Sequence, residues 1–198
     1  MADRSWEKCD HHGAGTGKAG VDPDNIDLVE YLNTLGIELD FSLCTSVTAC
    51  FRDCGGFSRI GVVNLQNCTS MLQFYYRSGG YTNSLTKIDK LILPHHISVV
   101  GNAFTNCTRL TSVDFEMVDE NSFLGGENIT IAHAPFDAPT SRSLIKCLEN
   151  YIGTENEYIY TFTLTETSWL LLNADTNNPP PQGDTWQAYV QTLGWNVG

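Results

Sequence analysis

The chain has 198 residues, of which 41% are hydrophobic, and its 11 basic and 23 acidic residues give a net charge of −12 at pH 7. This length and composition predict one domain with a sizeable core. The excess of acid argues against a nucleic-acid partner and against docking on anionic lipid, because both depend on Lys and Arg, and no apolar run is long enough to insert in a membrane.

The N-terminal region is predicted to divide into an arm and a short helix. Residues 1–25 are polar and glycine-rich, which predicts a flexible arm that becomes ordered only against another molecule. This stretch has no apolar leader, so we expect thiols that are made, and stay reduced, in a cytoplasm. Residues 26–36 carry apolar side chains at helical spacing and end at Gly36, which predicts an amphipathic capping helix.

A cysteine-centred pattern recurs in the next part of the chain. Its frame is apolar-x-x-Cys-x-x-apolar-x-x-apolar, and two copies share the string Asn-Cys-Thr. The four copies centre on Cys44, Cys54, Cys68 and Cys107. The copies are unevenly spaced, but the constant cysteine slot predicts a repeat architecture. In such a frame we expect the thiols to be reduced and buried as small hydrophobic groups.

Short β-prone runs alternate with turn-rich links between residues 37 and 132. The runs are IGVVNL (60–65), MLQFYY (71–76), KLILP (90–94), LTSVDFEM (110–117) and NITIA (128–132). Strands and links this short are compatible with an antiparallel sandwich. The cysteine frame favours instead an α/β fold leaning to β, a solenoid in which each strand stacks in parallel on the last.

The pattern changes after residue 132, and residues 133–198 are predicted to close the stack as an α/β cap. We expect a helix in APTSRSLIKCLENYIG, with Ser141 or Ser143 as its N-cap and Gly153 as its stop. A strand is expected in YIYTFTLTETSW. The exposed loop NNPPPQG then leads to a second helix, stopped at Gly194, and a final strand of two or three residues.

The segment GNAFTNCTRLTSVDF resembles the BspA-type leucine-rich repeat, whose unit runs Ile-Gly-x-x-Ala-Phe-x-x-Cys-x-x-Leu-x-x-Val. The matching residues are Val100, Gly101, Ala103, Phe104, Cys107, Leu110 and Val113. The run LILPHHISVVGNAF and the Gly-Trp-x-Val ending are similar to the strand end and C-terminal cap of such proteins in gut bacteria and their phages, whereas the units at 41–76 lack the Ile-Gly and Ala-Phe elements. The resemblance covers roughly residues 37–198. It implies a leucine-rich-repeat solenoid over 37–132 and a family of surface binders, which are not, as a family, enzymes.

The sequence predicts no catalytic, cofactor-binding or metal site. The stretch GAGTGKAG (13–20) departs from the phosphate-loop spacing and has Ala after Lys18, and the neighbouring histidines of His11–His12 and of His95–His96 point opposite ways in an extended chain. The stretch FYYRSGGY is a better lead, because Tyr and Arg are enriched at binding hot spots. The candidate binding residues are Tyr75, Tyr76, Arg77 and Tyr81. In a strand one of the two adjacent tyrosines faces the core and the other solvent; alternatively, both pack beneath the loop.

Three functions are compatible with these features. The first is a non-enzymatic binding or structural module of a phage virion, which needs neither a secretion signal nor an anchor and would use the arm to engage neighbouring subunits. The second is a bacterial cell-surface adhesin, which requires a leader and an anchor. The third is a small intracellular protein that sequesters a host protein. The partner is a protein, or a cell-surface glycan, and none of the three needs a cofactor.

Overall fold

The computed structural model describes residues 39–52, 58–71, 73–75, 84–94, 103–119, 124, 128–149 and 159–198. The predicted arm (1–25) and capping helix (26–36) lie outside the described residues. The described part is a mixed α/β structure with two parallel sheets and three helices.

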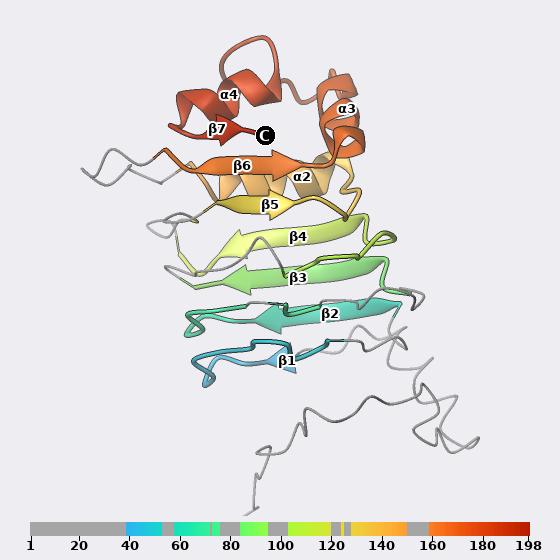
Figure 1. Ribbon diagram of the computed structural model, residues 1–198, viewed down its shortest axis with the longest axis vertical. Coiled ribbons are helices and arrows are strands. Elements are labelled where there is room, and N and C mark those ends of the chain that lie inside the picture. The colour runs from blue at the N-terminus through green and yellow to red at the C-terminus, as the bar shows by residue number, and fades with distance from the viewer. Residues whose placement is uncertain are drawn as a thin grey trace, which may run out of the picture.

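The first sheet contains four strands in chain order. They are β1 (Leu39–Asp40), β2 (Arg59–Asn64), β3 (Lys87–Leu93) and β4 (Ser112–Met117). Every neighbouring pair is parallel, and Figure 1 shows the four arrows one above another. Leu39 pairs with Val63, Val63 with Leu91 and Leu91 with Phe115, which are steps of 24, 28 and 24 residues. The predicted parallel stacking is confirmed for these four strands, and the antiparallel alternative is wrong for them. The predicted run NITIA (128–132) does not continue this stack, because its strand pairs in a second sheet.

The links that follow β1 and β2 also run side by side. Ser46 forms a parallel bridge with Ser70, and the Phe51 amide donates to the Phe74 carbonyl oxygen at 2.8 Å. A strand and its following link therefore behave as one unit, which we call a layer. Hydrogen bonds join one layer to the next on the strand side and on the link side.

One predicted strand, residues 71–76, is wrong. Gln73 has a left-handed backbone with φ of 55°, and Ala49, at the same place in the preceding layer, has φ of 56°. A left-handed residue interrupts the extended backbone that a strand requires. The chain therefore turns at these two positions, and the apolar side chains around Gln73 enter the core from a turn.

The hydrophobic core fills the space between the first sheet and the links and continues into the C-terminal region. In two copies of the cysteine frame all four slots are buried. These residues are Leu65, Cys68, Met71 and Phe74, and then Phe104, Cys107, Leu110 and Val113. From the strands, Ile60, Val63, Ile88 and Leu91 face them. For these two copies the prediction that the frame marks the core is confirmed.

The second sheet contains three short parallel strands near the C-terminus. They are β5 (Ile129–Ile131), β6 (Thr161–Leu164) and β7 (Asn196–Val197), in that order. Their arrows run opposite to those of β1–β4 (Figure 1). The predicted strand YIYTFTLTETSW is too long, because Thr165 ends it by capping a helix that the sequence reasoning missed, α3 (Glu166–Ala174). The Thr165 hydroxyl accepts from the Ser168 amide at 3.1 Å.

Two further helices complete this part of the chain. Helix α4 (Trp186–Thr192) ends just before Gly194, which has φ of 88°, and β7 follows, as predicted. Helix α2 (Ala138–Lys146) begins earlier than predicted, because its N-cap is Asp137, whose carboxylate accepts from the Thr140 amide at 2.9 Å. The predicted stop at Gly153 lies outside the described residues.

Helix α2 covers the free edge of β4. The Val113 amide donates to the Thr140 hydroxyl at 2.9 Å, and the Phe115 amide donates to the Ser143 hydroxyl at 3.1 Å. Two hydroxyls of a helix therefore take the place of the carbonyl oxygens that a fifth strand would supply. The first sheet ends at β4 because its edge amides are already satisfied.

Candidate binding surface

The first sheet has an open face, formed by the exposed and half-buried side chains of β2, β3 and β4. On β3 the core residues Ile88 and Leu91 are separated by two such residues, Asp89 and Lys90. A β-bulge accounts for this spacing, since the pairing with β4 shifts between Ile88 and Leu91. The extra residue lets two successive charged side chains stay out of the core.

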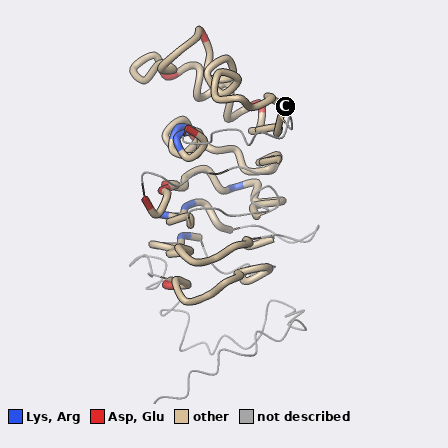
Figure 2. Tube along the Cα trace, turned by 90° about the vertical axis from the view of Figure 1, so that its left-hand side faces the viewer, with Lys and Arg blue, Asp and Glu red and all other residues tan. Residues whose placement is uncertain are grey.

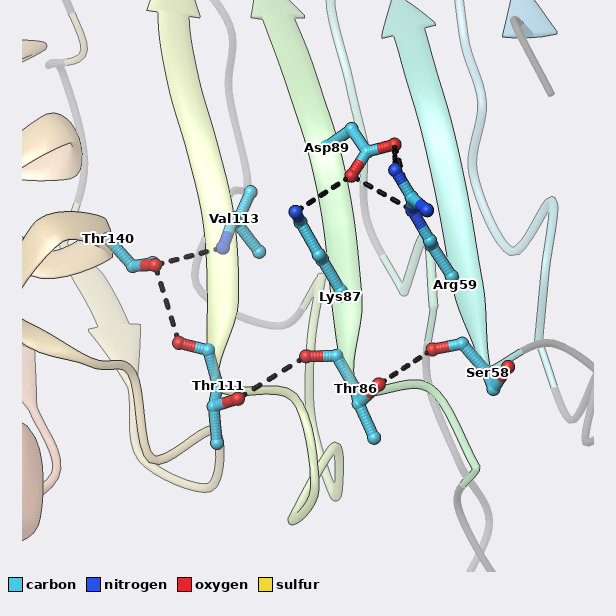
Figure 3. A network of polar contacts seen from close by, with 8 residues as sticks. All are labelled: Ser58, Arg59, Thr86, Lys87, Asp89, Thr111, Val113 and Thr140. Carbon is cyan, nitrogen blue, oxygen red and sulfur yellow. Dashed lines mark hydrogen bonds and ion pairs between the residues drawn. The ribbon is translucent and has the colours of Figure 1, made fainter. Parts of the chain in front are cut away.

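An ion-pair network joins β2 to β3 on this face. The Arg59 guanidinium donates to both carboxylate oxygens of Asp89, at 3.0 Å from Nε to Oδ1 and at 2.6 Å from Nη2 to Oδ2. The Lys87 Nζ lies 3.1 Å from Asp89 Oδ1 (Figure 3). Burial by itself would raise the pKa of Asp89, but the hydrogen bonds from Arg59 and Lys87 outweigh it and hold the pKa below its ordinary value.

A second ion pair joins β3 to β4. Lys90 contacts Glu116, and the hydrogen bond and charge of Glu116 raise the pKa of Lys90. Asp114 is exposed beside them on β4. The open face thus presents three cations and three anions: Arg59, Lys87, Lys90, Asp89, Asp114 and Glu116.

Charge is distributed unevenly between the two ends of the molecule. Residues 147–198 contain six acidic residues and no Lys, Arg or His. Figure 2 accordingly shows blue segments beside the first sheet and α2, and only red ones toward the C-terminal end. The mixed-charge open face and the basic-free C-terminal end are therefore separate surfaces with different electrostatic character.

A ladder of hydroxyl groups runs along the N-terminal ends of the strands. The hydroxyls of Thr86, Thr111 and Thr140 donate to the carbonyl oxygens of Ser58, Thr86 and Thr111, at 2.9, 3.4 and 3.3 Å (Figure 3). The sequence reasoning missed this ladder. Its signal is a Ser or Thr two residues before a buried Ile or Val, which occurs in SRI (58–60), TKI (86–88) and TSV (111–113).

The candidate binding residue Tyr75 is not on the surface. Its side chain is 0% exposed and lies in the core, with its ring 6.2 Å from that of Phe51. The turn at Gln73 and the hydrogen bond from the Tyr75 amide to the Ala103 carbonyl, at 2.8 Å, direct it inward. The other three candidates, Tyr76, Arg77 and Tyr81, lie outside the described residues.

The frame cysteines do not share one environment. Cys68 and Cys107 are buried, and their thiols donate to the carbonyl oxygens of Cys44 at 3.1 Å and of Tyr75 at 2.9 Å, each in the preceding layer. Burial raises the pKa of Cys68 to about 11. The expectation of burial is wrong for Cys44, which is exposed because it lies in the first described layer, with no earlier described layer to pack against. Cys54 lies outside the described residues.

Reactive groups are scattered rather than clustered in the part of the chain that the structure describes. Cys147 is buried, which raises the pKa of its thiol to about 12, and His133 is exposed. Among the described residues no three His, Cys, Asp or Glu side chains are close enough together to hold a metal ion. Within the same residues, no helix is both long and apolar enough to span a membrane.

Comparison with protein-family models, with curated proteins and with solved structures finds no match to this chain.

Proposed function

We propose that this protein is a non-enzymatic binding module of a phage virion, built as a short, irregular leucine-rich-repeat solenoid. The observation that carries the proposal is the pair of parallel contact lines between successive layers. One line joins the strands at steps of 24, 28 and 24 residues, and the other joins the links at Ser46 and Ser70. Stacked layers that pair on both sides are the arrangement from which repeat proteins are built.

The buried cysteines support the repeat interpretation. A chain that turns a corner leaves carbonyl oxygens without a strand partner, and these need a donor. The Cys68 thiol, just after β2, and the Cys107 thiol, just before β4, each supply a weak donor to a carbonyl oxygen of the preceding layer while filling apolar space. The resemblance to the BspA-type repeat includes Cys107 in its motif. Residues 133–198, together with β5, which pairs with β6, then serve as the C-terminal cap, with α2 covering the edge of β4.

The open face is the proposed binding surface. It is a sheet face on which ion pairs hold five of the six charged side chains, so the surface is preorganised and loses little side-chain freedom on binding. Its mixed charge suits a protein surface with complementary charges. A location on a phage particle is supported by the family resemblance alone, and the partner would then be a neighbouring virion protein.

A quantitative inventory of purified phage particles tests the location. We expect peptides of this chain at a copy number in fixed ratio to another structural protein. Deleting residues 1–25 is expected to leave the remaining chain folded but to prevent its incorporation. Absence from the particles, or incorporation of the shortened chain at the normal copy number, would overturn the virion assignment and favour an adhesin or an intracellular binder.

A charge reversal tests the surface. Asp114→Lys alters the open face at an exposed position and is expected to reduce incorporation at unchanged thermal stability. The matched control is Glu166→Lys, which makes the same charge change at an exposed position on α3. Equal effects of the two variants would show that net charge, rather than the open face, governs incorporation.

A further inference from the structure

Two frame cysteines lie next to each other in successive layers. Cys44 and Cys68 occupy the same slot, and the residues that follow them are hydrogen-bonded, with the Thr69 amide donating to the Thr45 carbonyl oxygen at 2.8 Å. Neighbouring parallel backbones are about 4.8 Å apart. Disulfides join residues whose Cα atoms are about 4.4 to 6.8 Å apart. The layer spacing therefore falls within the range that a disulfide requires.

The two thiols differ in exposure to solvent, as an oxidation in two steps requires. Cys44 is exposed and accessible to a small oxidant, whereas Cys68 is 1% exposed. The Cys68 sulfur already points at Cys44, since it donates to the carbonyl oxygen of that residue at 3.1 Å. Cys107 differs, because its sulfur lies against the carbonyl oxygen of Tyr75, a residue without a thiol.

We propose that Cys44 and Cys68 form an oxidation site, at which a low-molecular-weight disulfide such as oxidised glutathione converts the two thiols to an intramolecular disulfide. Cys44 is the attacking cysteine and Cys68 the resolving one. The proposal rests on the stacking of the two segments and does not depend on the phage assignment.

The chemistry is a pair of thiol–disulfide exchanges. The Cys44 thiolate attacks one sulfur of oxidised glutathione, a mixed disulfide forms, and one glutathione thiolate leaves. Cys68 then loses its proton to water, and its thiolate attacks the Cys44 sulfur and expels the second glutathione thiolate. Two protein thiols are oxidised to one disulfide, and one molecule of oxidised glutathione is reduced to two thiols.

The disulfide would fasten the first described layer to the second. The layer that contains β1 holds the sheet with a strand of only two residues, Leu39–Asp40. A covalent link beside this strand fixes the end of the sheet under oxidising conditions and releases it under reducing ones. The site is thus a redox-dependent fastening at the β1 end of the stack.

Peptide mapping of the full-length protein tests the site. The reduced protein is freed of reductant, incubated with oxidised glutathione, alkylated and digested with trypsin. Cleavage after Lys18, Arg52, Arg59 and Arg77 places Cys44, Cys54 and Cys68 on three different peptides. We expect a linked pair made of residues 19–52 and 60–77, lighter by two hydrogens than the sum of its parts.

Two matched variants identify the cysteine on the first of these peptides, which also carries Cys50. Cys44→Ser, at an exposed position that leaves the core intact, is expected to abolish the linked pair. Cys50→Ser is expected to leave it in place. Circular dichroism of both variants verifies that they are folded, so that loss of the link reports on chemistry.

Several results would overturn the proposal. One is a linked pair that survives Cys44→Ser; another is a link to the peptide that contains Cys54. A third is Cys44 found only as a glutathione adduct, and a fourth is a dimer of two chains joined through Cys44 on a non-reducing gel. An unmodified Cys44 after prolonged incubation would also overturn it.

Discussion

The two ends of the described structure hold their parallel strands in place in different ways. In the β1–β4 region each layer is completed by the next, through strand pairing on one side and link contacts on the other. In the C-terminal region three short strands are held by helices and by aromatic packing. There the Phe162 ring lies 5.9 Å from that of Trp169 and 6.4 Å from that of Trp195.

This difference shows how a stack of parallel strands is brought to an end. A layer with free edge amides accepts another layer, which is also a route to aggregation. Helix α2 removes that possibility at β4, because Thr140 and Ser143 occupy the amides of Val113 and Phe115. The chain then continues as a second sheet that runs in the opposite direction (Figure 1).

Removal of an aromatic ring from the C-terminal core should have the largest effect. Phe162 on β6 is fully buried between two tryptophans, so Phe162→Ala is expected to lower the free energy of unfolding by about 3–5 kcal/mol. Urea denaturation measures the loss. Leu170→Ala on α3 is the control, since Leu170 is 64% exposed and should change stability by about 0.5 kcal/mol at most. Similar losses for the two variants would show that the aromatic cluster does not hold this region together.

Loss of the hydroxyl that covers β4 should have the next largest effect. Thr140→Val keeps the shape of the side chain but leaves the buried Val113 amide without its acceptor. We expect a loss of about 2 kcal/mol in the free energy of unfolding. Thr130→Val, on the exposed side of β5, is the matched control and should be close to neutral. If Thr140→Val is also neutral, the helix does not terminate the sheet by this hydrogen bond.

Replacing a cysteine inside the stack should lower the stability more than replacing one at its end. Cys107→Ser places a hydroxyl in a buried slot, where the Tyr75 carbonyl still accepts a hydrogen bond. The expected loss is therefore about 1 kcal/mol, at the low end for a buried polar group. Cys44→Ser, at the exposed position of the same frame, should change stability little. Thermal unfolding in the presence of reductant compares them, and equal losses would contradict the distinction between interior and end.

The ion pairs of Asp89 on the open face should contribute least to the free energy of unfolding. Because the pKa of Asp89 is lowered in the folded protein, its contribution is present above the unfolded pKa of about 3.9 and is lost as the pH falls through the folded value. The contribution should be at most about 1 kcal/mol, because Arg59 and Lys87 are partly exposed.

The free energy of unfolding, measured from pH 7 to pH 3, checks whether this contribution is lost as the pH falls. Asp89→Asn should be less stable than the natural chain at pH 7, and the difference should shrink on acidification. Asp184→Asn, in the exposed loop before α4, serves as the control for a general loss of negative charge. A difference that persists unchanged at low pH would mean that Asp89 acts through packing and not through its charge.

Several features of the fold could be read from short stretches of the sequence. The end of α4 at Gly194 follows from the need for a left-handed residue after a helix. The strands β2, β3, β4 and β5 coincide with β-prone runs, because such side chains suit a half-buried sheet surface. Two complete copies of the cysteine frame mark the core. Each of these signals lies within a few consecutive residues, so it can be recognised without knowing which distant segments pack against it.

Other features were decided only when the layers came together. Tyr75 is buried because the left-handed turn at Gln73 redirects the chain, and nothing in MLQFYY signals that turn. Asp89 and Lys90 both avoid the core because a bulge in the pairing of β3 with β4 adds a residue there. Each outcome depends on an interaction with a distant segment, which alternation within one strand does not encode.

Cys44 and Cys68 show most directly that the sequence pattern does not encode burial. The frame around Cys44 and the frame around Cys68 look alike in the sequence, yet one thiol is exposed and the other is buried. The residue pattern alone places Cys44 and Cys68 at matching positions of one sequence frame. Which of the two thiols is covered depends on the layer that packs against it, and that layer comes from a different part of the chain.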